Sequence, residues 1–288
     1  MGSAEDLKAK IAKLEKQIAE ILENTRQDLE LATTLQKLLM PNRTHNVSGV
    51  NCITRYYSAG QLNSDTYDLI TSPSGRHLWF VHLWTASFGL SSLFLHAIVQ
   101  LQTQAQSKME PKPSLEDFFD VIALSLAESP RNIPFRIRLS SLDTGTLKLR
   151  SLSQGFPPLL KRSARGASVT EWNAIGLEGY AEETAFADAS SKGGLNSSQA
   201  VLTETTLEPG CRIFSISPTW NREARDWKSF MAPLQIGVGD SGSRPDTDLK
   251  DDTNHLLYRA EAYTKAQPIT QDVSVIALEI DRNKLHLA

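Results

Sequence analysis

The sequence is poor in the features that mark several classes of protein. It holds only two cysteines in 288 residues, Cys52 and Cys211, each in an apolar segment without a nearby cysteine. We therefore expect two reduced core thiols rather than a disulfide framework or a zinc site. No apolar run approaches the roughly 20 residues that cross a bilayer, and the N-terminal lysines precede no apolar block of the signal-peptide kind. These absences predict a cytoplasmic protein without a membrane span.

The net charge and the short motifs exclude several further classes of protein and site. A net charge of −3 gives no reason to expect nucleic acid as a partner. The chain has no Gly-rich phosphate loop and no serine nucleophile elbow. His77 and His82 are five positions apart on one expected strand, so they face opposite sides and form no ligand pair. One acidic cluster is expected to cap a helix or face solvent: Asp246, Asp248, Asp251 and Asp252.

What the sequence does contain begins with a continuous heptad pattern over residues 4–39. The core positions of its first three heptads hold Leu7, Ile11, Leu14, Ile18 and Ile21. Isoleucine at position a with leucine at position d favours a parallel two-stranded coiled coil. We therefore expect a homodimer through this helix. The alternative is a single amphipathic helix folded back on its own domain.

The pattern changes at Asp28, which interrupts the apolar seam. Beyond it the apolar stripe widens, as in a helix that packs on a globular domain. The residues of this wider stripe are Leu29, Leu31, Ala32, Leu35, Leu38 and Leu39. Pro41 then ends the helix. We predict a coiled-coil or linker helix over residues 1–40 and one domain over residues 41–288.

The second part of the chain is organised around a hairpin within residues 59–89. Its turn is Ser72-Pro73-Ser74-Gly75, and its second strand, residues 78–84, is nearly continuous in aromatic and aliphatic side chains. Further strands are expected at residues 50–58, 135–142, 146–152, 199–206, 210–217 and 273–280. Helices are expected at residues 90–107, from Ser114, and at 223–230 and 252–265, with loops at 188–198 and 237–247. Such a mixture predicts a layered α+β domain.

Three short motifs resemble the SpoIIE/RsbU branch of the metal-dependent 2C-class serine/threonine phosphatases. Residues 63–68, Asn-Ser-Asp-Thr-Tyr-Asp, stand where that family has Gly-Gly-Asp-aromatic-Tyr-Asp, and residues 84–89 stand where it has Asp-Val-Ser-Gly-His-Gly. Residues 154–158 match its Ala-Gly-His-Pro-Pro turn, with Phe156 replacing the histidine. The resemblance implies a phosphatase 2C-like αββα sandwich preceded by the N-terminal coiled-coil helix.

In the resembling family four acidic positions hold two Mn²⁺ or Mg²⁺ ions, which activate a water for phosphoester hydrolysis. Here only Asp65 is retained. The other three positions have become Trp84, Thr219 and Gln271, and the residual acids of the degenerate site are Asp65, Asp68 and Asp272. We therefore expect no catalytic residue, no bound metal, and a tryptophan in the volume where the ions lie.

These expectations together predict a pseudophosphatase, that is, a catalytically inactive phosphatase-like signalling or scaffold module of the bacterial type. It would dimerise through its N-terminal helix and bind a regulatory protein partner, which the resemblance suggests is an anti-sigma-factor antagonist or another regulatory domain. The first alternative is a weakly active Mn- or Mg-dependent serine/threonine phosphatase. The second is a coiled-coil dimer with an unrelated α+β domain.

Overall fold

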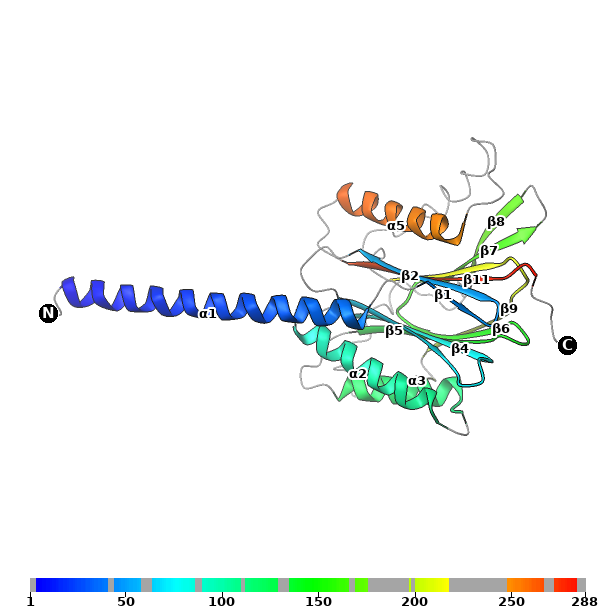
Figure 1. Cartoon of the computed structure of the whole chain (residues 1–288), viewed down its shortest axis with the longest axis horizontal. Coiled ribbons are helices and arrows are strands. Elements are labelled where there is room, and N and C mark those ends of the chain that lie inside the picture. Colours follow the sequence, from blue (N-terminus) through cyan, green and yellow to red (C-terminus); the bar gives the residue numbers. More distant parts are fainter. Residues whose placement is uncertain are drawn as a thin grey trace.

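The computed structural model shows two antiparallel sheets face to face, with helices on both outer faces (Figure 1). This confirms the predicted α+β class and its layered αββα form. The residues that the structure describes are 4–40, 44–57, 64–85, 90–109, 112–128, 135–165, 169–175, 197, 200–217, 248–266 and 272–283. Among them, no helix is long and apolar enough to cross a membrane.

One sheet has six strands in the order β1-β2-β11-β10-β7-β8. Helix α5 (Leu249–Ala266) covers its outer face through contacts with β2 and β11. The strands are β1 (Thr44–Val47), β2 (Val50–Tyr57), β7 (Leu159–Arg165), β8 (Val169–Ile175), β10 (Arg212–Ile216) and β11 (Val273–Ile280). The sequence pattern predicted β2, β10 and β11 but not β1, β7 or β8.

The other sheet has five strands in the order β3-β4-β5-β6-β9. Helices α2 (Leu90–Ser107) and α3 (Leu115–Ala127) cover its outer face, and the Ser114 hydroxyl caps α3 by accepting from the Asp117 N–H, as the sequence predicted. The strands are β3 (Asp65–Thr71), β4 (His77–Thr85), β5 (Phe135–Asp143), β6 (Lys148–Gln154) and β9 (Val201–Thr206). All five agree with predicted segments.

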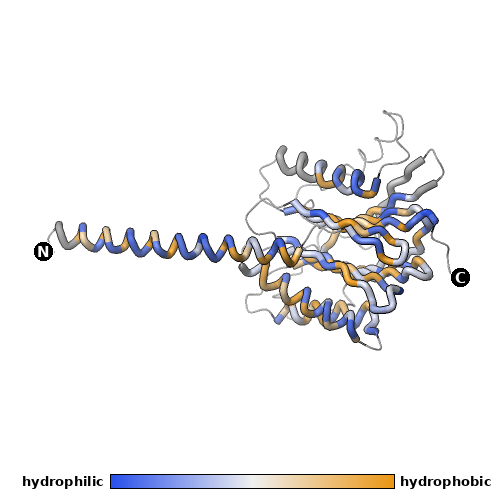
Figure 2. Tube along the Cα trace, viewed as in Figure 1, coloured by the Kyte–Doolittle hydropathy of each residue, from blue (hydrophilic) through white to orange (hydrophobic). Residues whose placement is uncertain are grey.

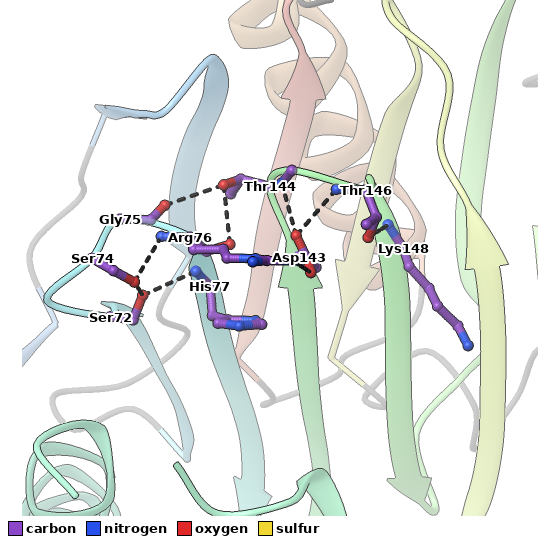
Figure 3. A network of polar contacts seen from close by, with 10 residues as sticks. Ser72, Ser74, Gly75, Arg76, His77, Asp143, Thr144, Thr146 and Lys148 are labelled. Carbon is purple, nitrogen blue, oxygen red and sulfur yellow. Dashed lines mark hydrogen bonds and ion pairs between the residues drawn. The ribbon is translucent and has the colours of Figure 1, made fainter. Parts of the chain in front are cut away.

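Two neighbouring hairpin turns of this sheet are joined by hydrogen bonds (Figure 3). In the β3–β4 turn, Gly75 has a φ of +68°, which suits glycine, and its N–H donates to the Ser72 carbonyl at 2.8 Å. The Thr144 hydroxyl of the β5–β6 turn donates to the carbonyls of Gly75 and Arg76. These bonds fix the ends of β4 and β5 relative to each other.

The apolar core forms three layers because each strand alternates its side chains between faces. On β4, Leu78 and Phe80 point between the two sheets, whereas Trp79, Val81 and Leu83 pack under α2 and α3. A third layer lies between the six-stranded sheet and α5. Both cysteines are free and buried in the layer between the sheets, as expected.

The prediction that one face of β5 is exposed to solvent was wrong. Its alternation of apolar and polar residues suggested a half-buried strand, but Arg136, Arg138 and Ser140 are 4%, 2% and 0% exposed. These side chains lie on the same face as Leu142, which packs between the sheets. The polar face of β5 is therefore covered by the second sheet rather than by solvent.

Helix α1 (Ala4–Leu39) extends away from the sandwich, and only its C-terminal part lies against it (Figures 1 and 2). There the buried residues are Ala32, Gln36 and Met40, and α1 contacts α2. The expectation that the whole widened stripe packs on the domain was wrong in part. Leu31, Leu35 and Leu38 are 61%, 44% and 70% exposed, because they lie on a different face of α1 from the three buried residues.

Several predictions fall outside the described residues. These are the helix at 223–230, the loop at 237–247 and nearly all of the loop at 188–198, together with Thr219 and Gln271. Helix α5 falls where a helix was expected at 252–265 and begins three residues earlier, at Leu249.

Candidate functional site

Three side chains on adjacent strands mark the candidate site, at one end of the layer between the sheets. Asp65 on β3 is the register partner of Trp84 on β4, and Trp84 is the register partner of Arg136 on β5. Directly opposed residues of antiparallel strands point to the same face. All three are at most 5% exposed. The sheet thus aligns a carboxylate, an indole and a guanidinium in one row.

Trp84 occupies the middle of this row. The guanidinium carbon of Arg136 lies 5.0 Å from the centre of the indole ring, which is within the range of a cation–π contact. The indole Nε1–H is buried and has no hydrogen-bond acceptor among the described residues. Trp84 is therefore held by packing and by the stacked guanidinium.

Two buried carboxylates lie beside Trp84. Asp65 accepts a hydrogen bond from the Ser274 hydroxyl at 2.7 Å, and Asp272 accepts one from the Ser64 N–H at 2.5 Å. Burial raises the pKa of Asp65 well above its usual value, and the nearby Asp272 carboxylate raises it further. The Ser274 and Ser217 hydroxyls oppose this shift through hydrogen bonds to Asp65. Both carboxylates already use oxygen atoms for bonds within the protein.

A chain of hydrogen bonds joins the two sheets at this site. Arg138 Nη1 donates to Ser215 Oγ at 3.0 Å, and Ser215 Oγ lies 3.0 Å from His82 Nδ1. His82 Nε2 lies 2.6 Å from Ser274 Oγ, whose proton is directed at Asp65. Because that hydroxyl proton is used, His82 Nε2 is the donor and Nδ1 accepts from Ser215.

A neutral His82 ring agrees with this assignment of donor and acceptor nitrogens. Its ring is fully buried, and burial lowers its pKa well below the usual value; the positive charge of Arg138 lowers it further. A neutral ring has one donor and one acceptor nitrogen, as the chain requires. Arg138 also donates to the Pro157 carbonyl and lies 5.3 Å from the Phe156 ring. Phe156 thus stacks on a buried guanidinium.

The structure brings together some predicted site residues and separates others. Asp65, Trp84 and Asp272 meet between the sheets. Asp68 lies apart from them, because its carboxylate accepts bonds from the Leu69 N–H and from the Thr103 hydroxyl on α2.

One member of the acidic cluster at the start of α5, Asp252, differs from its predicted role. Asp248 accepts from the Lys250 N–H, as a helix cap does. Asp252 is 8% exposed, however, and forms ion pairs with Arg162 and Arg212 of the six-stranded sheet. It does not face solvent, because α5 lies flat on that sheet. Asp252 attaches the helix to the sheet instead.

The described residues do not fit a pair of divalent cations. Such ions take six or more oxygen ligands, largely from carboxylates. No group of three or more His, Cys, Asp or Glu side chains in the described part of the chain is placed to hold a metal. The donor set at the site is two carboxylates bonded to serine groups, next to an indole and an arginine.

Sequence reasoning missed His82, Arg138 and Ser215. Strand periodicity contained the signal for the first of these, because His82 is two residues from Trp84 and therefore shares its face. The partners of His82 come from β10 and β11, more than 130 positions away, so no local pattern could identify them.

No protein-family model matches the sequence, and no curated protein matches it. Solved structures do match. The SiaA-PP2C domain of Pseudomonas aeruginosa superposes with a TM-score of 0.64 at 10% identity, over 91% of this chain and 99% of that one. RsbX in complex with magnesium superposes with a TM-score of 0.53 at 10% identity, over 83% and 99% of the two chains.

The RsbU and RsbW domains of Rv1364c from Mycobacterium tuberculosis superpose with a TM-score of 0.60 at 16% identity. This match covers 83% of the present chain but 63% of the other, so the present chain spans less than two thirds of it. At these identities the likeness concerns the fold alone. It confirms the fold that the motif resemblance implied. This chain has the fold of the SpoIIE/RsbU-type phosphatase 2C domains.

Proposed function

We propose that this chain is a catalytically inactive phosphatase-like signalling module of the cytoplasm. It dimerises through α1 and binds a regulatory protein partner. It requires no metal cofactor. The module acts by presenting surfaces rather than by chemistry, and the parallel arrangement of two α1 helices sets which surfaces face each other.

The observation that carries the proposal is the row formed by Asp65, Trp84 and Arg136. Two similar structures are complexes with metal ions. They are RsbX with magnesium and the PstP catalytic domain with two manganese ions. In this chain a buried indole, that of Trp84, lies opposite Asp65 on the next strand, and the Arg136 guanidinium stacks on that indole. A positive side chain near this place disfavours a divalent cation, and the two carboxylates of the site, Asp65 and Asp272, fall short of the oxygen ligands that two such ions take.

The exposed apolar surface of α1 supports dimerisation. Its heptad core residues are 48–63% exposed in the single chain: Leu7, Ile11, Leu14, Ile18 and Ile21. Fully burying one exposed side chain of this kind contributes about 1.5–3 kcal/mol, and these are about half exposed, so a matching helix gains roughly half of that for each of the five. Figure 2 shows apolar stretches alternating with polar ones along the part of α1 that extends from the sandwich, where no other described helix or strand lies beside it.

The choice of a regulatory protein as partner is supported by the domains that accompany this fold in one similar structure. One similar structure contains an RsbU domain together with an RsbW domain. The partner is therefore proposed by class only.

A phosphatase assay tests the inactivity. We expect no hydrolysis of p-nitrophenyl phosphate or of a phosphoserine peptide above background in millimolar Mn²⁺ or Mg²⁺. The matched control is Asp65→Asn, because any real activity through the residual acid would disappear in this variant. Turnover that Asp65→Asn abolishes would establish the alternative, a weakly active metal-dependent phosphatase.

Light scattering tests the dimer. The unaltered chain should give twice the 31.9 kDa mass of one chain at micromolar concentration. Replacing Ile11 and Ile18 by Asp places charges in the apolar seam and should give the monomer. Replacing Ala12 and Ala19 by Asp adds the same charge one position further round the helix and should leave the dimer intact. A monomeric unaltered chain would refute the assignment.

A further inference from the structure

A second concave site lies far from Trp84, on the outer face of the five-stranded sheet. It is a cavity of about 270 Å³ between the strand ends at the hairpin turns and the start of α3. His77 lines it, at the opposite end of β4 from Trp84. Seven residues of strand separate the two positions by roughly 23 Å. The cavity is therefore independent of the site between the sheets.

One side of the cavity is apolar and well supported. Trp79, Pro113 and Leu115 line it, and Trp79 and Leu115 are 6% and 2% exposed. The Trp79 ring packs against Phe118 of α3, with ring centres 5.2 Å apart. This surface is preformed, and it suits a flat apolar group.

Four basic side chains also line the cavity, together with Asp143 and three hydroxyl side chains. The basic ones are His77, Lys112, Lys148 and Arg150, and the hydroxyl groups are those of Ser114, Ser141 and Thr146. Lys148 and Arg150 share the carboxylate of Glu204, and Arg150 also pairs with Glu116. Lys112 forms no ion pair among the described residues, and the ring of His77 forms no hydrogen bond among them. The Lys112 ammonium and the His77 ring thus line one small space without an ion pair or ring hydrogen bond to each other or to another described residue.

The charges around His77 show the same imbalance. Burial lowers the pKa of His77, and the positive charge of Lys112 lowers it further, as does that of Arg76. Among the described residues, Asp143, which also lines the cavity, opposes them. Its carboxylate is already bound by Arg76 and by the N–H groups of Gly145 and Thr146 in the turn (Figure 3).

We propose that this cavity binds a small organic anion, a carboxylate or phosphate group carried on a flat apolar body. The anionic group lies between Lys112 and His77 and accepts hydrogen bonds from both. The apolar body lies on Trp79 and Leu115. The volume is at the low end for ligand pockets, so the ligand has about the size of one substituted ring. This site does not depend on the proposed function.

Nuclear magnetic resonance of the full chain labelled at histidine Cε1 tests the proposal. His77→Asn identifies the His77 signal, and the probes are phenyl phosphate, benzoate, inorganic phosphate and the neutral benzamide. We expect phenyl phosphate and benzoate to shift this signal with saturation and to raise the pKa of His77, because an anion offsets the charge of Lys112. Comparing phenyl phosphate with benzoate shows which anionic group is preferred.

The controls separate the two halves of the site. Lys112→Gln should weaken binding of both aromatic anions about tenfold or more, as the loss of a charged hydrogen-bond partner does. Lys250→Gln, an exposed lysine on α5, should leave binding unchanged. Inorganic phosphate that binds as tightly as phenyl phosphate would overturn the role of the apolar surface. Benzamide binding equal to benzoate, or no saturable shift with any anion, would overturn the anion site itself.

Discussion

Trp84 offers the sharpest test of how the site is stabilised. The indole is 5% exposed and stacks on Arg136. Trp84→Ala removes this packing and leaves a buried guanidinium beside a cavity. Large-to-small changes of this kind cost about 3–5 kcal/mol, against total stabilities of about 5–15 kcal/mol for a domain. We expect the free energy of unfolding to fall by about that amount.

A paired variant distinguishes packing from hydrogen bonding. Trp84→Phe keeps an aromatic face for Arg136 and removes the Nε1–H, which has no acceptor among the described residues. A buried donor without a partner costs about 1–3 kcal/mol, so its removal offsets part of the lost volume. The phenylalanine variant should therefore lose less than half as much stability as the alanine variant.

The assay is urea unfolding followed by far-UV circular dichroism, at one protein concentration because a dimer adds to apparent stability. At a similar dependence on urea, the midpoint should fall by about 1–2 M for Trp84→Ala. Trp84→Asp should also destabilise the fold, because it adds a third buried carboxylate near Asp65 and Asp272. A cost below about 1 kcal/mol for Trp84→Ala would refute the view that this side chain fills the space between the sheets.

Two further predictions concern other buried polar groups. Asp252→Asn leaves two buried guanidinium groups without their shared carboxylate, so the free energy of unfolding in urea should fall by about 3–5 kcal/mol. At the exposed neighbour, Asp251→Asn should change it by less than about 0.5 kcal/mol. Equal effects of the two variants would contradict the role of Asp252. Burial lowers the pKa of His96 from 6.5 to about 3, so the unfolded chain binds a proton that the folded chain does not. Its contribution is present above pH 6.5 and is lost as the pH falls towards 3, by about 1.4 kcal/mol per pH unit inside that range. Thermal melting of His96→Gln should show a weaker loss below pH 6.5 than the exposed control His45→Gln, and parallel pH profiles would contradict this.

Much of the secondary structure follows from local patterns in the sequence. Turn residues and the Ser114 cap are local features, and they predicted the β3–β4 hairpin and the start of α3. The strands β7 and β8 were missed because charged and polar residues interrupt their pattern. The polar face of β5 was assigned to solvent because periodicity shows that two faces differ but does not show what covers them.

The candidate site was predicted in part. The motifs predicted that Asp65 and Trp84 lie together, and the register confirms this. Asp68 was grouped with them, but it is three residues from Asp65 on a strand, so it faces α2 instead. The bonds of His82 to Ser215 and Ser274 depend on how one sheet lies over the other, which no single segment encodes.

The sequence by itself determined the long heptad helix and the place of most strands along the chain, because these depend on residue type and spacing. Tertiary structure alone decided which side chains lie around Asp65 and between the sheets. Two sheets packed face to face enclose Arg136 and Arg138, remove them from water and stack them on Trp84 and Phe156. Packing also placed Lys112 next to His77 at the other end of the sheet, because α3 begins over the ends of β4–β6. Each of these contacts joins segments far apart in the chain, so it exists only once the layers have assembled.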